Sequence, residues 1–267
     1  MNVADDELVD FEAYGAAPLP DAEREGFVDH DGARIWHASY GSGPAVILLH
    51  GGLGNAGNWG FQVPALVEEG YQVVVIDSRG HGRSTRDSRP FKYQLLASDV
   101  LAVMDHLGLA EAALVGWSDG ACTALILADQ VPERICGVFF FACNTDPSGV
   151  HEFKPTPVID RCFSRHRKDY QALSATPGEF EAFVAAVTVM MQSEPNYGAN
   201  DLARIAVPVT VAIGENDEFI KPEHADYLAR TIPDAELIVL PRVSHFAPLQ
   251  RPELFNREVL GFLDRIA

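Results

Sequence analysis

Residues 112–122 read Ala-Ala-Leu-Val-Gly-Trp-Ser-Asp-Gly-Ala-Cys, a short apolar run that ends in Gly-x-Ser-x-Gly and leads into a helical pattern. This order predicts a strand, a sharp turn and a helix, with Ser118 at the tip of the turn in a strained backbone conformation. Glycines two residues before and after the serine leave room for strand and helix to approach closely. The hydroxyl of Ser118 is therefore expected to be open to a ligand. Because this short pattern is common, the rest of the chain must supply an acid, a histidine and an oxyanion hole.

Apolar runs of strand length alternate with helical patterns along the chain. They lie at 45–49, 72–77, 135–143, 207–213 and 236–240. Such runs are typical of parallel strands buried on both faces, and parallel neighbours need crossover connections. The sequence therefore predicts an α/β fold, a mostly parallel central sheet with helices on both faces. Ligands of such sheets bind at the carboxyl ends of the strands.

Two segments break this alternation. Residues 1–22 are acidic and end in Ala-Ala-Pro-Leu-Pro, which favours a flexible N-terminal arm. Residues 144–200 mix prolines, a basic cluster at 165–168 and a helical stretch from Phe180 to Met191, and we interpret them as a small helical cap insertion. The core is then expected in two parts, 23–143 and 201–267.

An acid and a histidine follow the last two predicted strands. Asp217 lies in Gly-Glu-Asn-Asp after the first, and His245 lies in Ser-His-Phe after the second. The order Ser118, Asp217, His245 is the nucleophile, acid and base order that this kind of turn requires. Glu215 and Asp146 are the alternative acids, because both also lie at the same predicted edge.

The remaining parts of a nucleophile site are also present in the sequence. Gly51 and Gly52 follow the strand at 45–49, and the backbone N–H of Gly52 with that of Asp119 would form an oxyanion hole, with Leu53 as the neighbouring donor. His245 would take the proton of Ser118, and Asp217 would hold the imidazole. Asp119, Leu53 and Trp117 are the expected substrate contacts.

Composition limits the partners and the cofactors. Lys and Arg number 20 against 38 Asp and Glu, and the net charge of −18 disfavours nucleic acid and membrane surfaces. The cysteines show no metal-ligand spacing and are expected to be free thiols in a reducing compartment; they are Cys122, Cys136, Cys143 and Cys162. The sequence shows no signal peptide or transmembrane pattern, which favours a cytoplasmic location. No metal and no cofactor are expected.

Most of the histidines have a structural interpretation. His50 and His81 are expected to shape glycine turns through hydrogen bonds. Five other histidines have no catalytic or metal-ligating partner at a regular spacing and are expected at surface or cap positions; they are His37, His106, His151, His166 and His224. The cap cluster at 165–168 would either form a solvated face or meet an acidic substrate.

Together these motifs resemble the α/β-hydrolase superfamily, in its branch with a serine nucleophile. The features that carry the resemblance are His50-Gly51-Gly52, the loop 77–84 (Asp-Ser-Arg-Gly-His-Gly-Arg-Ser), Gly116-Trp117-Ser118-Asp119-Gly120, and Gly214-Glu215-Asn216-Asp217 with Ser244-His245. The resemblance implies an esterase-like enzyme with the triad Ser118, His245 and Asp217. Haloalkane dehalogenases and epoxide hydrolases are disfavoured, because they carry aspartate in place of the serine.

Within this branch the turn looks most like the valacyclovir hydrolase (biphenyl hydrolase-like) group, although Ala121 stands where that group usually has glycine. The resemblance implies that Asp119 binds a substrate amino group; favourable interaction with the helix dipole is the other interpretation. The expected ligand is a small ester or acyl substrate, and the protein would be a monomer or homodimer. Enol-lactone hydrolysis, carbon–carbon bond hydrolysis and cofactor-free perhydrolysis stay open, as does a ligand receptor with weak hydrolase activity.

Overall fold

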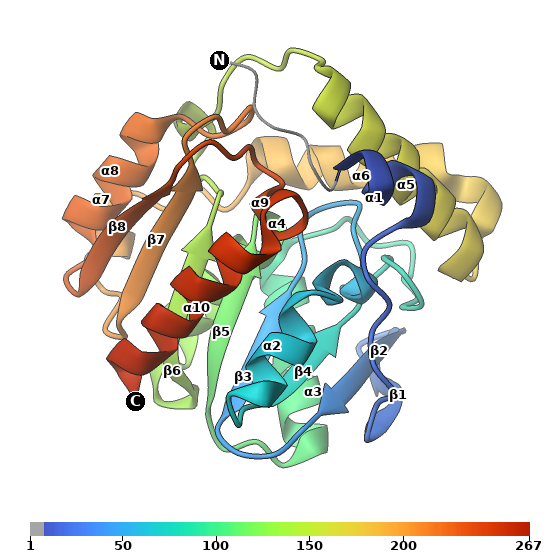
Figure 1. The fold of residues 1–267 in the computed structure, drawn as a ribbon, viewed down its shortest axis with the longest axis horizontal. Helices are drawn as coiled ribbons and strands as arrows, with labels where there is room; N and C mark the ends of the chain where they lie inside the picture. The colour runs from blue at the N-terminus through green and yellow to red at the C-terminus, as the bar shows by residue number, and fades with distance from the viewer. Residues whose placement is uncertain (1–7) are drawn as a thin grey trace.

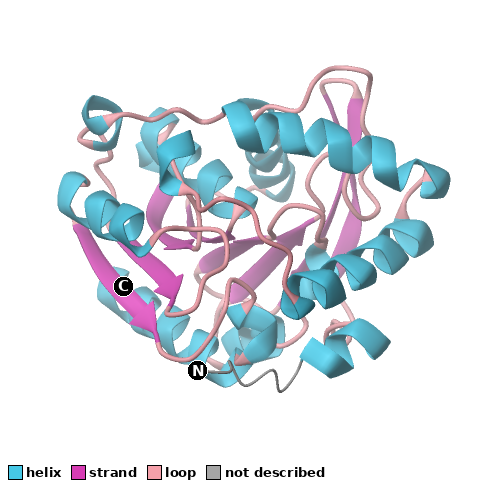
Figure 2. Ribbon diagram, turned by 90° about the horizontal axis from the view of Figure 1, so that it is seen from above, coloured by secondary structure: helices cyan, strands magenta, loops and turns pink. Residues whose placement is uncertain are grey.

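The structure is a computed structural model that describes residues 8–267. Eight strands form one sheet in the order β1-β2-β4-β3-β5-β6-β7-β8 (Figures 1 and 2). The strands are β1 (Arg24–His30), β2 (Ala33–Tyr40), β3 (Ala45–Leu49), β4 (Gln72–Ile76), β5 (Ala112–Trp117), β6 (Ile135–Phe141), β7 (Val209–Gly214) and β8 (Ala235–Leu240). β2 pairs antiparallel with β1 and β4, and all other neighbours are parallel. The predicted α/β class with a mostly parallel sheet is confirmed.

Helices cover both faces of the sheet. On one face lie α2 (Gln62–Glu68) and α10 (Pro252–Ile266); on the other lie α3 (Tyr93–Leu107), α4 (Asp119–Gln130) and α8 (Pro222–Thr231) (Figure 1). The remaining helices are α1 (Leu8–Tyr14), α5 (Pro157–Leu173), α6 (Phe180–Ser193), α7 (Ala199–Leu202) and α9 (Ala247–Gln250). Short 3-10 helices occur at Ala56–Trp59, Pro132–Arg134, Pro147–Gly149 and Pro177–Glu179.

The apolar runs form strands because both of their faces are buried. In β3, Ile47 and Leu49 pack into the core on the α3 and α4 side, whereas Val46 and Leu48 pack into the core on the α2 and α10 side. Successive side chains of a strand point to opposite faces, so a strand between two helix layers needs apolar residues at every position.

The segment between β6 and β7 forms a helical layer over the carboxyl ends of the parallel strands. Helices α5 and α6 lie at the top of the view, beyond the carboxyl ends of the parallel strands (Figure 1). The sequence indicates a helix near α6 but not α5. Helix α5 buries only one narrow stripe of side chains, Ile159, Cys162, His166 and Tyr170. Because charged residues lie between these positions in the sequence, the helical periodicity of the apolar residues is weak there.

The N-terminal segment differs from the expected flexible arm over 1–22. Residues 1–7 lie outside the described residues, but Leu8–Tyr14 form α1, whose side chains Leu8 and Phe11 are buried. Helix α1 packs against α5, and Lys168 Nζ donates to the carbonyl oxygen of Glu12 at 3.2 Å. The acidic composition of this segment gave no indication that Leu8 and Phe11 are buried.

Three histidines that the sequence analysis groups as surface or cap residues are buried. His37, His166 and His224 are exposed by 2%, 2% and 6%. His166 is on α5, His37 is on β2 and His224 is on α8. The expectation of a surface position is therefore wrong for His37 and His224, because strand and helix packing covers them. All four cysteines are free thiols.

No helix within residues 8–267 is both long and apolar enough to cross a lipid bilayer.

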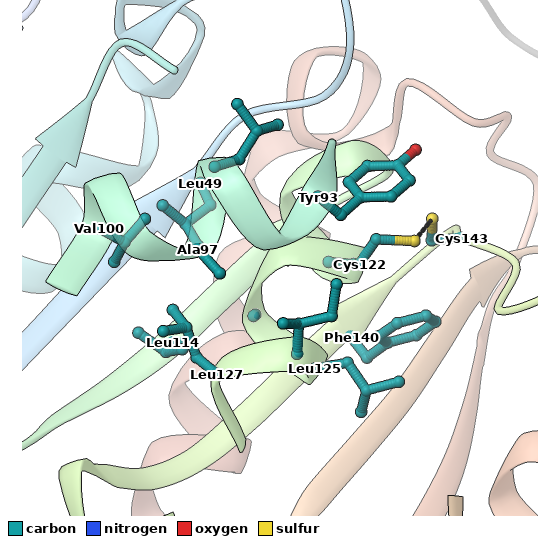
Figure 3. Close-up of a cluster of buried hydrophobic side chains, with 14 of the residues drawn as sticks. Leu49, Tyr93, Ala97, Val100, Leu114, Cys122, Leu125, Leu127, Phe140 and Cys143 are labelled. Carbon is teal, nitrogen blue, oxygen red and sulfur yellow. Dashed lines mark hydrogen bonds between the residues drawn. The ribbon is translucent and has the colours of Figure 1, made fainter. Parts of the chain in front are cut away.

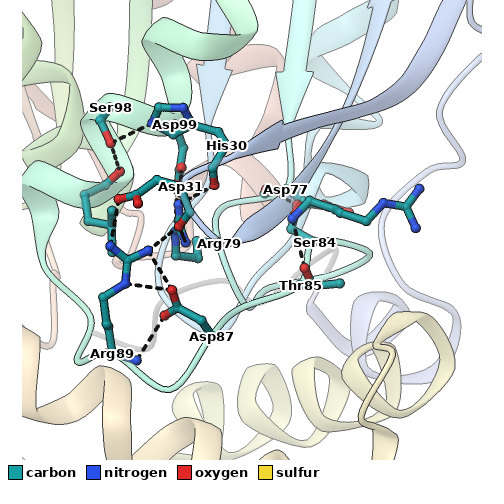
Figure 4. A network of polar contacts seen from close by, with 12 residues as sticks. His30, Asp31, Asp77, Arg79, Ser84, Thr85, Asp87, Arg89, Ser98 and Asp99 are labelled. Atoms are coloured by element: carbon teal, nitrogen blue, oxygen red, sulfur yellow. Dashed lines mark hydrogen bonds and ion pairs between the residues drawn. The ribbon is translucent and has the colours of Figure 1, made fainter.

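A buried ion pair anchors the loop that follows β4. Arg79 donates from Nε and Nη2 to Asp99 of α3, at 2.9 and 2.6 Å, and both side chains are 2% exposed. Its guanidinium also donates to the carbonyl oxygens of Asp31 and His30, at 2.9 and 3.1 Å (Figure 4). The Arg79 side chain thus ties the β4 loop to α3 and to the β1–β2 turn.

We expect Arg79→Ala to lower the free energy of unfolding by about 3–5 kcal/mol, because it leaves Asp99 buried without its partner. Arg89 is the matched control: it also contacts Asp31, but its side chain is 43% exposed. In urea denaturation, Arg89→Ala should cause a much smaller loss. Equal losses for the two variants would contradict this assignment.

Candidate active site

Ser118 lies at a strained turn between β5 and α4. Its φ and ψ are 54° and −122°, a conformation that a residue other than glycine rarely adopts. A Cβ at Gly116 would lie 2.4 Å from Ala121 Cα, and a Cβ at Gly120 would lie 2.0 Å from the Leu49 carbonyl oxygen. The two glycines are therefore required for the close approach of α4 to β5 and β3.

The loop after β3 contacts this turn directly. A Cβ at Gly51 would lie 3.2 Å from Ser118 Cβ, and a Cβ at Gly52 would lie 2.7 Å from Asp119 Oδ2. His50 shapes the loop: its Nδ1 donates to the Gly51 carbonyl oxygen at 2.8 Å, and its Nε2 accepts from the Ser78 N–H at 3.0 Å. The structural interpretation of His50 is confirmed.

His81 has a similar structural role. Its Nδ1 lies 2.9 Å from the carbonyl oxygen of Arg79, and its ring packs edge-to-face on Phe183 at 4.7 Å between centroids. Burial lowers the pKa of His81 to about 3, so the ring is neutral. His81 thus connects the β4 loop to helix α6.

Asp217 and His245 form a buried pair at the carboxyl ends of β7 and β8. His245 Nδ1 lies 3.0 Å from Asp217 Oδ2 and 3.1 Å from Oδ1. Asp217 Oδ1 also accepts from the backbone N–H groups of Phe219 and Ile220, at 2.9 and 2.8 Å. These bonds orient the carboxylate toward the imidazole.

The alternative acids make other contacts. Asp146 Oδ1 accepts from the Ser148 N–H at 2.8 Å, and its Oδ2 lies 4.0 Å from His224 Nδ1. Glu215 Oε2 accepts from the Arg242 N–H at 2.8 Å. The structure therefore brings Asp217 to His245 and places Asp146 and Glu215 in local turns.

Opposing effects set the protonation of His245. Burial disfavours its charged form, but the negative charge and hydrogen bond of Asp217, assisted by Glu218 and Asp119, leave the pKa of His245 above its ordinary value. Glu218 Oε2 also accepts from the backbone N–H of His245 at 3.0 Å. This environment favours an imidazolium, the form that a general base reaches after it accepts a proton.

Ser118, His245 and Asp119 line one cavity of about 640 Å³, whose wall also includes side chains from α5 and α6. The predicted oxyanion donor Gly52 and the predicted substrate contacts Leu53 and Trp117 also line it. Helices α5 and α6 contribute mainly apolar side chains, including Phe163, Val184 and Met191. Trp117 Nε1 donates to the His245 carbonyl oxygen at 2.9 Å, so Trp117 also holds the histidine loop.

Asp119 is a buried carboxylate with one oxygen left unpaired. Its Oδ1 accepts from the Tyr93 hydroxyl at 2.7 Å, but its Oδ2 has no hydrogen-bond partner among residues 8–267. Burial raises the pKa of Asp119 to about 6, with Tyr93 and His245 acting in the opposite direction. A buried acceptor without a partner is costly, so this oxygen is suited to a ligand that donates a hydrogen bond.

The sequence analysis missed Tyr93 as a part of the site, and it considered His166 only within the basic cluster at 165–168 that could meet a substrate. Tyr93 begins α3, and the sequence shows it only as an apolar helical position. His166 lines the cavity from α5, and burial lowers its pKa to about 3, so its ring is neutral; its Nδ1 has no partner among the described residues. No local motif marks either residue, because their positions depend on how α3 and α5 pack.

The basic cluster at 165–168 divides in the structure. Arg165 pairs with Asp169 at 2.6 Å, Arg167 pairs with Glu181, and Lys168 contacts α1. Within residues 8–267, no group of three or more His, Cys, Asp and Glu side chains is arranged to hold a metal ion.

Residues 44–193 match a family model described as alpha/beta hydrolase fold. A 2-hydroxy-6-oxononadienedioate/2-hydroxy-6-oxononatrienedioate hydrolase of Burkholderia vietnamiensis is 30% identical, over 87% of this chain and 91% of that protein. Mouse serine hydrolase BPHL is 27% identical, over 87% of this chain and 84% of that protein.

Among solved structures, Est816, titled an N-acyl homoserine lactone degrading enzyme, has a TM-score of 0.71 and 30% identity, covering 89% of this chain and 100% of that chain. The chain spans 64% of one further curated relative, the dihydrolipoyllysine-residue acetyltransferase component of an acetoin cleaving system in Pseudomonas putida.

We expect Asp217→Asn to lower the pKa of His245, since burial then acts against the smaller effects of Glu218 and Asp119 alone. Imidazole NMR signals followed against pH measure this change. Asp146→Asn is the matched control and should leave the pKa of His245 unaltered. If only Asp146→Asn lowered the pKa of His245, Asp146 and not Asp217 would be the acid that pairs with His245.

Proposed function

The chain belongs to the α/β-hydrolase family, and from this premise we propose that it is a serine hydrolase that cleaves a small carboxylic ester through an acyl-enzyme. The observation that carries the proposal is that His245, paired with the buried Asp217, lines the same cavity as the strained Ser118. In this proposal Ser118 is the nucleophile, His245 the general base and Asp217 the orienting acid.

The reaction follows from these roles. His245 Nε2 takes the proton of Ser118 as Oγ attacks the ester carbonyl, while Nδ1–H donates to Asp217. The backbone N–H groups of Gly52 and Asp119 stabilise the oxyanion, a contribution of several kcal/mol in such sites. The imidazolium then protonates the leaving alcohol, and a water activated by His245 releases the acid from Ser118.

The cap forms the outer wall of the substrate cavity in this proposal. We assign the hydrolase core to residues 23–143 and 201–267 and the cap to 144–200. The side chains from α5 and α6 that line the cavity support this division. The acyl group would then lie between the apolar cap and the end of β6.

Carbon–carbon bond hydrolysis is the second candidate reaction. The Burkholderia vietnamiensis relative, 30% identical, is named a 2-hydroxy-6-oxononadienedioate/2-hydroxy-6-oxononatrienedioate hydrolase, and this likeness favours carbon–carbon bond hydrolysis. Est816, named as an N-acyl homoserine lactone degrading enzyme, favours lactone hydrolysis instead. A panel of simple esters, amino-acid esters, lactones and vinylogous diketones compares the candidates directly. We expect simple or amino-acid esters to give the highest kcat/KM.

We expect Ser118→Ala to lower kcat/KM for p-nitrophenyl acetate by about 10³-fold or more, because the nucleophile is lost. A fluorophosphonate probe should label the wild type and not this variant. Ser148→Ala, at an exposed position, is the control and should behave as wild type. Undiminished turnover by Ser118→Ala would refute the mechanism.

We also propose that Asp119 binds a substrate amino group when one is present, through its unpaired Oδ2. The ionised form of Asp119 grows as pH rises through its pKa of about 6. An α-amino group stays charged below about pH 7.7. The amine and the carboxylate therefore attract each other most strongly near neutral pH.

The ratio of kcat/KM for an α-amino ester to that for its des-amino counterpart should rise severalfold between about pH 5 and pH 7. This ratio cancels the titration of His245, which affects both substrates. Asp119→Asn should make the ratio low and independent of pH. A ratio that is flat in the wild type would refute the amine subsite while leaving the serine mechanism intact.

A further inference from the structure

Two thiols that the proposed mechanism does not use face each other beside the cavity. Cys122 Sγ, on α4, lies 2.9 Å from Cys143 Sγ, just beyond the end of β6. Figure 3 shows the two sulfur atoms directed at one another, next to Tyr93. A disulfide has its sulfurs about 2.05 Å apart, so the pair needs less than one ångström of approach to form one.

The surroundings of the pair limit what can reach it. Cys122 is 1% exposed and Cys143 is 5% exposed, but Cys143 lines the cavity that also holds Ser118 and Asp119. A small molecule in the cavity therefore has access to Cys143, whereas Cys122 does not line the cavity. Burial raises the pKa of Cys122, so it stays protonated and reacts only with a partner already in contact.

The other two cysteines lack this arrangement. Cys136 is half-buried on β6, and Cys162 is buried on α5. Among residues 8–267, Cys122 and Cys143 are the only cysteines with a sulfur–sulfur contact at hydrogen-bond distance. Both thiols also donate to the Asn144 carbonyl oxygen, Cys122 Sγ at 3.1 Å and Cys143 Sγ at 3.5 Å. This shared acceptor holds the two sulfurs close to each other.

We propose that Cys122 and Cys143 are an oxidative modification site, which a small neutral peroxide entering through the cavity converts to a disulfide in the cavity wall. Cys143 sulfur attacks one peroxide oxygen, forming a sulfenic acid and releasing one water. Cys122 sulfur then attacks the sulfenic sulfur, forming the S–S bond and releasing a second water. Two thiols are oxidised and one hydrogen peroxide is reduced to two waters.

The disulfide would change the wall of the substrate cavity. Cys122 lies one helical turn after Ser118, and Cys143 precedes Asn144, which also lines the cavity. Closing the bond draws the end of β6 toward α4 and removes the thiol donors of the Asn144 carbonyl oxygen. The inference rests on the thiol geometry and holds whichever substrate the enzyme cleaves.

The test is to treat the fully reduced protein with hydrogen peroxide and to measure intact mass and non-reduced peptide maps. We expect loss of two hydrogen atoms and a cross-linked peptide pair containing Cys122 and Cys143, reversed by dithiothreitol in denaturant. Cys136→Ser and Cys162→Ser should retain the cross-link, and Cys143→Ser should lack it. Because the wild-type map alone identifies the bond, the result does not depend on the folding of any variant.

Access is tested separately with Ellman's reagent, a bulky anionic disulfide. In the folded protein it should modify Cys136 at least tenfold faster than Cys122 or Cys143. Peroxide oxidation that stops at sulfinic acid on Cys143, or cross-links other cysteines, would overturn the proposal. Equal rates of modification by Ellman's reagent at all four cysteines would overturn the route through the cavity.

Discussion

The structure depends on a steric constraint at the N-terminus of α4. Helix α4 can approach β3 only because residue 120 has no side chain: a Cβ there would lie 2.0 Å from the Leu49 carbonyl oxygen. Leu49 ends β3 and leads into the glycine loop, so the same contact sets the distance between that loop and Ser118. The strained backbone of Ser118 costs about 1–3 kcal/mol, which the buried packing of β5 and α4 offsets.

Around this turn the fold gathers polar groups at the edge of an apolar cavity. The parallel strands end at the same side of the sheet, so Ser118 and His245 line one cavity and Asp217 pairs with His245, although the three are far apart in the sequence. Backbone N–H groups hold Asp217, and Trp117 holds the His245 loop. The same apolar surroundings raise the pKa of Asp119, and one of its carboxylate oxygens has no partner among the described residues.

Much of the fold could be predicted from the sequence, because parallel strands need continuous apolar runs and glycine patterns mark the turns after them. The family, with BPHL among its relatives, was correctly identified from those turns. The order of residues in the chain left three candidate acids for His245, which are Asp217, Glu215 and Asp146, because the sequence gives no distances between side chains. Helix α5 and the buried α1 were missed because their apolar stripes are narrow. The partnership of Tyr93 with Asp119 joins residues 26 positions apart and arises only from packing.

The central claim is that Ser118 carries the acyl group during turnover. The most direct measurement is rapid acid quenching of the enzyme during p-nitrophenyl acetate hydrolysis, followed by peptide mass analysis. We predict a transient mass gain of one acetyl group on the peptide that contains Ser118, absent when Ser118 is replaced by alanine. Turnover without an acetylated peptide, or with acetyl on a residue other than Ser118, would contradict the claim.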